Sequence, residues 1–141
     1  MDARTIIERL ALEPHPEGGW FRETWRAEAR RGERASGTAI YFLLEQGQAS
    51  AWHRIDADEI WHYYAGAPLE LRVHRSPRTQ TWQLGPGLES GERPQKRVPA
   101  HAWQSARSLG EWSLVGCTVS PAFEFEHFEL AGPGEFPPRE A

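Results

Sequence analysis

Two patterns of hydrophobic and polar positions divide the chain. In the first segment, the apolar residues of RTIIERL recur at the spacing of one helix face, and Asp2 is well placed to cap the helix N-terminus. Two prolines follow closely, and proline cannot continue a helix. We therefore expect one short N-terminal helix that ends near Leu12.

After residue 19 the chain becomes a series of short runs rich in β-forming residues, separated by Gly, Pro, Asp and Ser turn signals. The runs are WFRETWRA (20–27), TAIYFLLE (38–45), SAWHRI (50–55), EIWHYYA (59–65), LELRVHR (69–75), TQTWQL (79–84), WSLVGCTV (112–119) and FEFEHFEL (123–130). A polar loop is expected over 27–37 and an irregular tail from Gly132. This pattern predicts an all-β sandwich or barrel.

Length and composition restrict the possibilities further. The 141 residues suit a single domain, and 39% hydrophobic and 26% charged residues are typical of a globular protein. The net charge is -4 and Lys96 is the only lysine, so we expect neither nucleic-acid nor membrane binding. Cys117 is the only cysteine, which excludes an intramolecular disulfide. No apolar run has the length of a signal peptide, and a cytoplasmic location is expected.

The most specific motif lies between Gly47 and Gly66. His53, Glu59 and the two glycines follow the spacing G-x5-H-x-H-x3-E-x6-G, with Ile55 in place of the second histidine. In a small antiparallel barrel, this spacing brings an imidazole and a carboxylate from neighbouring strands to the same inner face. Such a pair can bind a metal or a polar ligand.

This motif resembles the first motif of the cupin superfamily, and PAHAWQSARS (99–108) resembles the second. In the second motif Pro99 matches, while His101, Gln104 and Ser108 stand at its glycine, histidine and asparagine positions. The segments PHPEGGWFRETWR and LVGCTVSPAFEFEHFEL complete the likeness to a group of small single-domain cupins of unassigned function, related in barrel shape to sugar epimerases. The resemblance spans about residues 4–131. It implies a jelly-roll barrel (a double-stranded β-helix) and a homodimer, but no particular reaction.

Strand alternation selects the candidate site residues. If His53 and Glu59 face inward, Trp61 and Tyr63 do too, and the second motif adds Gln104. This predicts an aromatic-walled cavity with a few polar groups, which is typical of small-ligand sites. His53, Glu59 and Tyr63 are the candidate catalytic residues. The candidate ligand-binding residues are Arg22, Glu23, Trp61, Trp103 and Gln104.

Arg22 has two interpretations. Beside a Trp-lined cavity it could form bidentate hydrogen bonds to a carboxylate or phosphate of a ligand, or it could form an ion pair with Glu23. The first would suit a small polar or anionic ligand, such as a nucleotide or sugar nucleotide. This ligand-binding function is the main hypothesis. An isomerase or epimerase with His53 as general base and Tyr63 as acid is the alternative.

A metal-dependent enzyme is the third hypothesis, and the motifs argue against it. His53, Glu59 and Gln104 would be the ligands of any divalent metal, but Ile55 offers no donor and an amide is a weak one. No cofactor is therefore expected. His53 and Glu59 could instead form a buried hydrogen-bonded pair.

The remaining histidines and the cysteine are expected to have other roles. His62 should pack on the outer face, and His101 lies in a turn from which it could reach a cavity mouth. His15, His74 and His127 are expected to be structural or solvent-facing. Cys117 lies in a buried-strand pattern and is expected to be an unreactive core thiol.

Overall fold

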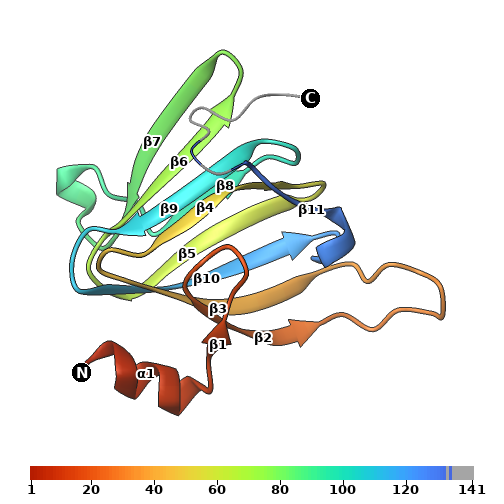
Figure 1. Cartoon of the computed structure of the whole chain (residues 1–141), viewed down its shortest axis with the longest axis horizontal. Coiled ribbons are helices and arrows are strands. Elements are labelled where there is room, and N and C mark those ends of the chain that lie inside the picture. Colours follow the sequence, from red (N-terminus) through yellow and green to blue (C-terminus); the bar gives the residue numbers. More distant parts are fainter. Residues whose placement is uncertain (133, 135–141) are drawn as a thin grey trace.

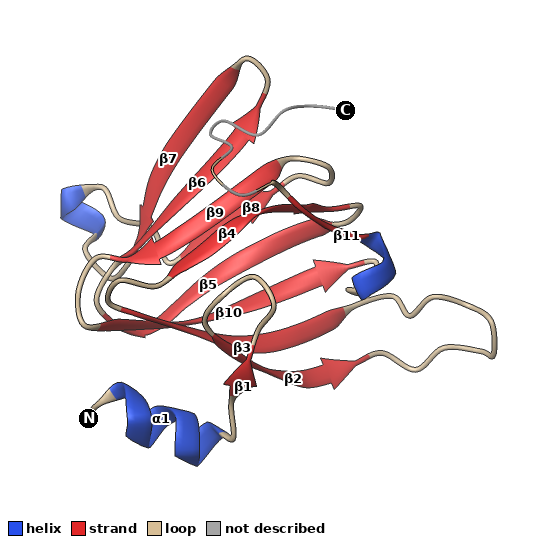
Figure 2. Ribbon diagram, in the orientation of Figure 1, coloured by secondary structure: helices blue, strands red, loops and turns tan. Residues whose placement is uncertain are grey.

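The structure, a computed structural model, describes residues 1–132 and 134 and consists of two antiparallel sheets that face each other, with one helix at the N-terminus (Figures 1 and 2). The helix is α1 (Ala3–Leu10). The strands are β1 (Glu13–Pro14), β2 (Trp20–Arg26), β3 (Thr38–Glu45), β4 (Ala49–Ile55), β5 (Asp58–Gly66), β6 (Leu69–Arg75), β7 (Arg78–Leu84), β8 (Gln95–Val98), β9 (Trp103–Ser108), β10 (Trp112–Ser120) and β11 (Phe128–Leu130). Two short 3-10 helices are η1 (Leu88–Ser90) and η2 (Phe125–His127).

Strands that are distant in sequence are neighbours in each sheet. One sheet has the order β1-β2-β3-β10-β5-β8 and the other β11-β4-β9-β6-β7. Consecutive strands such as β4 and β5 therefore lie in opposite sheets, as the jelly-roll expectation requires. His53 on β4 and Glu59 on β5 consequently approach each other across the space between the sheets.

Alternation along each strand builds the core. On β3, Phe42 and Leu44 point between the sheets, whereas Leu43 points to the other face. Trp61 on β5 and Leu71 on β6 fill the same inner core and are at most 1% exposed. The inner core thus consists of large apolar side chains from both sheets.

Helix α1 packs on the outside of the barrel. The Asp2 carboxylate accepts a hydrogen bond from the Thr5 backbone N–H at 2.9 Å, which confirms the predicted N-cap. Ala11 adopts a left-handed backbone conformation directly after the last helical residue. Ile6 and Leu12 form a second apolar cluster with Leu43, so the helix covers the outer face of β3.

The sequence prediction agrees with most elements and misses some. The helix, the polar loop before β3 and seven of the expected strands are confirmed. The run over 123–130 is not one strand, because η2 interrupts it before β11. Strands β1, β8 and β9 were not expected as strands; they lie in short polar or motif-like segments without clear alternation. The predicted irregular tail falls largely outside the described residues.

Within residues 1–132 and 134, no helix has the length and apolar character needed to cross a membrane.

Candidate functional site

A cavity of about 310 Å³ occupies one end of the space between the sheets. We call this the cavity end and the opposite end, filled by Leu69, Leu71 and Leu84, the packed end. Polar side chains from several segments line the cavity: Glu13, His15, Glu17, Glu23, Arg26, Thr38, His53, Glu59 and Glu124. Three phenylalanine rings, Phe21, Phe123 and Phe125, complete much of the wall.

His53 forms the centre of the site together with a residue that the sequence did not indicate, Glu17. The His53 Nε2 atom lies 3.0 Å from Glu17 Oε2, and both side chains are less than a tenth exposed. Ser50 Oγ donates a further hydrogen bond to Glu17 Oε1 at 2.9 Å. His53 Nδ1 lies 2.7 Å from the Ala51 carbonyl oxygen, which can only accept, so Nδ1 carries a proton.

Glu17 reaches His53 because the loop between β1 and β2 folds against β4. The Ala51 backbone N–H donates to the Glu17 carbonyl oxygen at 2.7 Å, which ties the loop to the strand. Gly18 has a φ of 105°, and a Cβ there would lie 2.6 Å from the Ala49 carbonyl oxygen. Only glycine allows both this conformation and this close approach.

Burial determines the protonation of the His53–Glu17 pair. It raises the pKa of Glu17 to about 8 and lowers the pKa of His53, because the charged form of each loses hydration. Both groups are therefore disfavoured as ions. At neutral pH, the Glu17 carboxyl keeps its proton and donates a hydrogen bond to the Nε2 lone pair of His53.

Glu59 belongs to a second hydrogen-bond chain. Trp61 Nε1 donates to Gln104 Oε1 at 2.7 Å, and Gln104 Nε2 donates to Glu59 Oε1 at 2.8 Å. Burial raises the pKa of Glu59 to about 7, while the nearby His53 opposes the shift. The chain places Glu59 on the cavity wall and keeps Gln104 and Trp61 behind it.

His15 is buried, as a structural histidine would be, but it also lines the cavity and does not face solvent. Its side chain is 5% exposed, and its Nδ1 accepts a hydrogen bond from the Glu17 backbone N–H at 3.0 Å. The Phe21 ring lies edge-on with its centroid 4.5 Å away. Burial lowers the pKa of His15 to about 4, so this imidazole is neutral at neutral pH.

The other predicted site residues are divided between the cavity and the rest of the barrel. Glu23 lines the cavity, whereas its neighbour Arg22 is exposed on the opposite face of β2. The Tyr63 hydroxyl donates a hydrogen bond to the Gly66 carbonyl oxygen at 2.7 Å, and Tyr63 is not among the described residues that line the cavity. Trp103 alternates with the inward-facing Gln104, and the Arg54 guanidinium lies 4.5 Å from its ring.

Cys117 and two further histidines occupy the positions expected of them. Cys117 is 2% exposed, and burial holds the pKa of its thiol well above the usual value, so the thiol stays protonated. It also lines the cavity beside Glu59. His62 lies on the outer face, 3.0 Å from Thr118 Oγ1. His127 is 43% exposed.

His101 explains one departure from the second cupin motif. It stands at the motif's glycine position and has a φ of 70°, in the left-handed region that favours glycine. Its ring lines a different surface hollow, shared with Arg54 and Asp56, rather than the main cavity.

The donor set of the site does not fit the metal centre of metal-binding cupins. Ile55 lines the cavity where a second imidazole would be needed. The oxygen of Gln104 accepts from Trp61, so the amide presents its nitrogen toward Glu59. The residues present thus supply one imidazole and one carboxylate from the metal-cupin pattern, which leaves most coordination positions without a protein ligand.

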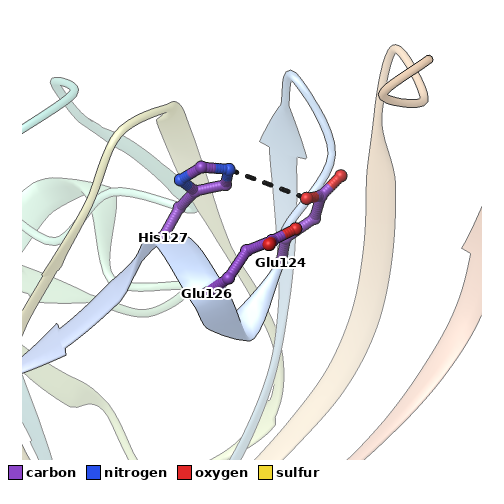
Figure 3. Close-up of side chains that lie close together, drawn as sticks. All are labelled: Glu124, Glu126 and His127. Atoms are coloured by element: carbon purple, nitrogen blue, oxygen red, sulfur yellow. Dashed lines mark ion pairs between the residues drawn. The ribbon is translucent and has the colours of Figure 1, made fainter. Parts of the chain in front are cut away.

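Glu124, Glu126 and His127 form a separate group of potential donor atoms at η2 (Figure 3). Their donor atoms lie within 4.8 Å of one another. The group already has a cationic neighbour, because Glu124 lies 3.8 Å from Arg34, and the His127 ring lies 3.7 Å from Glu124. These contacts account for the grouping of the side chains at an exposed surface.

Sequence reasoning missed Glu17, His15 and Arg26. The only signal for the first two was the segment PHPEGG, which carries the family resemblance and contains the paired glycines. This segment has no periodicity from which the direction of its side chains could be predicted. The phenylalanines of the 123–125 segment were read as a strand rather than as cavity wall.

An antiparallel jelly roll whose polar cavity is supplied by β4 and β5 is the architecture of a cupin. The chain belongs to the family described as Cupin superfamily (DUF985), whose profile matches residues 4–131. No curated protein matches the chain.

Solved structures agree with this assignment. Protein SO0799 from Shewanella oneidensis is 41% identical with a TM-score of 0.88, and the match covers 92% of this chain and 84% of that one. A hypothetical protein from Leishmania major is 34% identical with a TM-score of 0.84, covering 92% and 86%. An oxalate decarboxylase from Bacillus subtilis, at 13% identity and a TM-score of 0.65 over 83% of this chain and 29% of that one, shares the fold alone.

Proposed function

We propose that this protein binds a small polar molecule in the cavity and exchanges a proton with it through the His53–Glu17 pair. The proposal is carried by one observation: an imidazole and two carboxyl groups, each less than a tenth exposed, meet at the wall of a cavity of about 310 Å³. Burying such groups costs free energy that packing alone does not require. Ligand sites combine an apolar wall with a few convergent polar groups of perturbed pKa in this way.

The wall offers specific contacts to such a ligand. The second oxygen of Glu59 can accept a hydrogen bond from a hydroxyl or amine, and the phenylalanine rings can cover the apolar part. An anionic group finds less support, because carboxyl groups predominate on the wall and the nearest sequence candidate for binding it, Arg22, lies outside.

A blocked cavity provides the direct test. Ile40 lines the cavity, and Ile40→Trp would fill part of it. Tyr41 is next on β3 and faces helix α1, so Tyr41→Trp is the matched control. We expect ligand-observed NMR with a mixture of polar metabolites to show signals that disappear with Ile40→Trp and persist with Tyr41→Trp. Equal binding to both variants would place the ligand elsewhere.

Acid–base isomerisation is the second candidate function, and the geometry of His53 favours it. The Ala51 carbonyl holds the ring by Nδ1, and the Glu17 carboxyl occupies Nε2, so a ligand that displaces this carboxyl from Nε2 would meet an oriented general base. Glu59, with a pKa of about 7, could supply a proton from another side. Tyr63, the acid expected from sequence, is bonded to a backbone carbonyl instead.

Once a ligand is found, deuterium incorporation from D2O separates the two functions. An isomerase should exchange a carbon-bound hydrogen of its substrate, and His53→Gln should abolish the exchange while Glu89→Gln, an exposed variant on η1, should not. Binding without exchange would leave only the ligand-binding function.

A further inference from the structure

We infer that the ligand of the cavity is a small organic cation, an amine or guanidine attached to an apolar group. This inference rests on the proposed binding function and specifies its ligand class. It comes from the charges and rings on the cavity wall, considered together.

Carboxyl groups outnumber cationic groups on the wall. Five glutamates line the cavity, against a single guanidinium. That guanidinium, Arg26, is already engaged: its Nη2 lies 2.7 Å from Glu23 Oε1 and 2.9 Å from the Phe123 carbonyl oxygen. It therefore neutralises Glu23 and is not available to a ligand anion.

Two of the five glutamates have neither a cationic side chain in the described part of the chain nor a neutral form at neutral pH that is fixed by a neighbouring imidazole. Glu124 has Arg34 at 3.8 Å, and Glu17 needs no cation because it keeps its proton in the hydrogen bond to His53. Glu59, deep in the cavity, contacts only neutral donors, the Gln104 amide and the Cys117 thiol. Glu13, at the exposed side of the wall, has no ion pair among the described residues. A ligand cation would neutralise the carboxylates of Glu59 and Glu13.

The rings supply the second half of the site. Phe21, Phe123 and Phe125 line the cavity, and Phe125 is 53% exposed although it is large and apolar. Phe123 and Phe125 pack edge to face with centroids 4.8 Å apart, which leaves ring faces for a ligand. Aromatic faces attract cations and also pack against apolar groups. Carboxylates and ring faces in one cavity are the chemistry that recognises an organic ammonium ion.

Three probes of similar size and different charge test the inference: benzylamine, benzyl alcohol and benzoate. We expect calorimetry at a pH of about 7.5, above the pKa of about 7 for Glu59, to show benzylamine binding about tenfold more tightly than the alcohol. Benzoate should bind most weakly. Glu59→Gln keeps the acceptor for Gln104 but removes the charge, and should cost benzylamine about tenfold while leaving the alcohol unchanged. Glu89→Gln is the exposed control.

The outcomes separate this inference from the proposed function. If benzyl alcohol or benzoate binds as tightly as benzylamine, or if Glu59→Gln weakens all three equally, the cationic ligand class is wrong and the binding cavity stands. If none of the three binds up to its solubility limit, the cationic ligand class is wrong, and the binding function is decided separately by the comparison of Ile40→Trp with Tyr41→Trp. Glu13→Gln, at the exposed side, gives a second charge variant that leaves the core intact.

Discussion

The two ends of the barrel handle buried polar groups in opposite ways. At the packed end, Leu71 and its neighbours are fully buried, and the polar group Ser113 Oγ donates to the Ala67 carbonyl oxygen at 2.7 Å. At the cavity end, Glu17 and Glu59 are buried with their pKa values raised to about 8 and 7. The same fold thus stabilises itself at one end and retains unfavourable carboxyl groups at the other, which is the usual sign of a functional site.

The largest expected effect is on packing. Leu71→Ala should lower the free energy of unfolding by about 3 kcal/mol, because it opens a cavity in a filled core. Ile40→Ala should cost only about 1 kcal/mol, because Ile40 already borders empty space. Urea denaturation of both variants measures the difference. Equal losses would contradict the contrast between the two ends.

The hydrogen-bond chain between the ends gives the next effect. Gln104→Met removes the acceptor of Trp61 Nε1 and the donor to Glu59, at a site with no exposure, and should cost about 2 kcal/mol. Gln83→Met on the exposed face of β7 should change stability by less than about 0.5 kcal/mol. A neutral Gln104→Met would mean that the chain is not needed to hold Glu59 in place.

The pH dependence of the free energy of unfolding should report on the buried carboxyl groups of the cavity end alone. A carboxyl group whose pKa is raised on folding stabilises the protein below its unfolded pKa, and this contribution is lost as the pH rises through the folded pKa. With a usual pKa of 4.5 and folded pKa values of about 8 for Glu17 and about 7 for Glu59, the loss begins near pH 4.5 and is complete near pH 8. The part of the loss between pH of about 6.5 and 8, which histidines with lowered pKa values do not oppose, amounts to about 2 kcal/mol.

Denaturation curves recorded across that range test this dependence, with Glu17→Gln as the variant. The variant cannot ionise at position 17, so its stability should fall less with rising pH than that of the wild type. His15 and His53 have lowered pKa values and act in the opposite direction at lower pH, below their usual values near 6.5. Identical slopes for variant and wild type would show that Glu17 does not titrate in the folded protein.

The smallest expected effect is on metal content. Elemental analysis of the purified wild type should find far less than one transition metal per chain, because Ile55 and the orientation of Gln104 remove two donors. Ile55→His combined with Gln104→His restores both imidazoles and should gain metal, while Ile55→His alone should gain less. A full equivalent of metal in the wild type would revive the metalloenzyme hypothesis.

Much of this protein followed from local sequence. The cap at Asp2, the alternation along β3 and β5, and the spacing of His53 and Glu59 depend on residues close together in the chain. Backbone periodicity alone determines which way such residues face. Periodicity therefore predicted a sandwich or barrel and the inward direction of His53 and Glu59, while the resemblance to the cupin motifs supplied the jelly roll and the position at which Ile55 replaces a histidine.

Tertiary structure decided the rest of the polar site. Glu17 meets His53 only because a loop with glycine at position 18 folds onto β4 and bonds to Ala51, a long-range contact with no periodic signal. The orientation of the Gln104 amide depends in the same way on Trp61 from another strand. Local rules determine the direction of a side chain, but its partner is determined by which distant segments pack together, and for this site the partners define the chemistry.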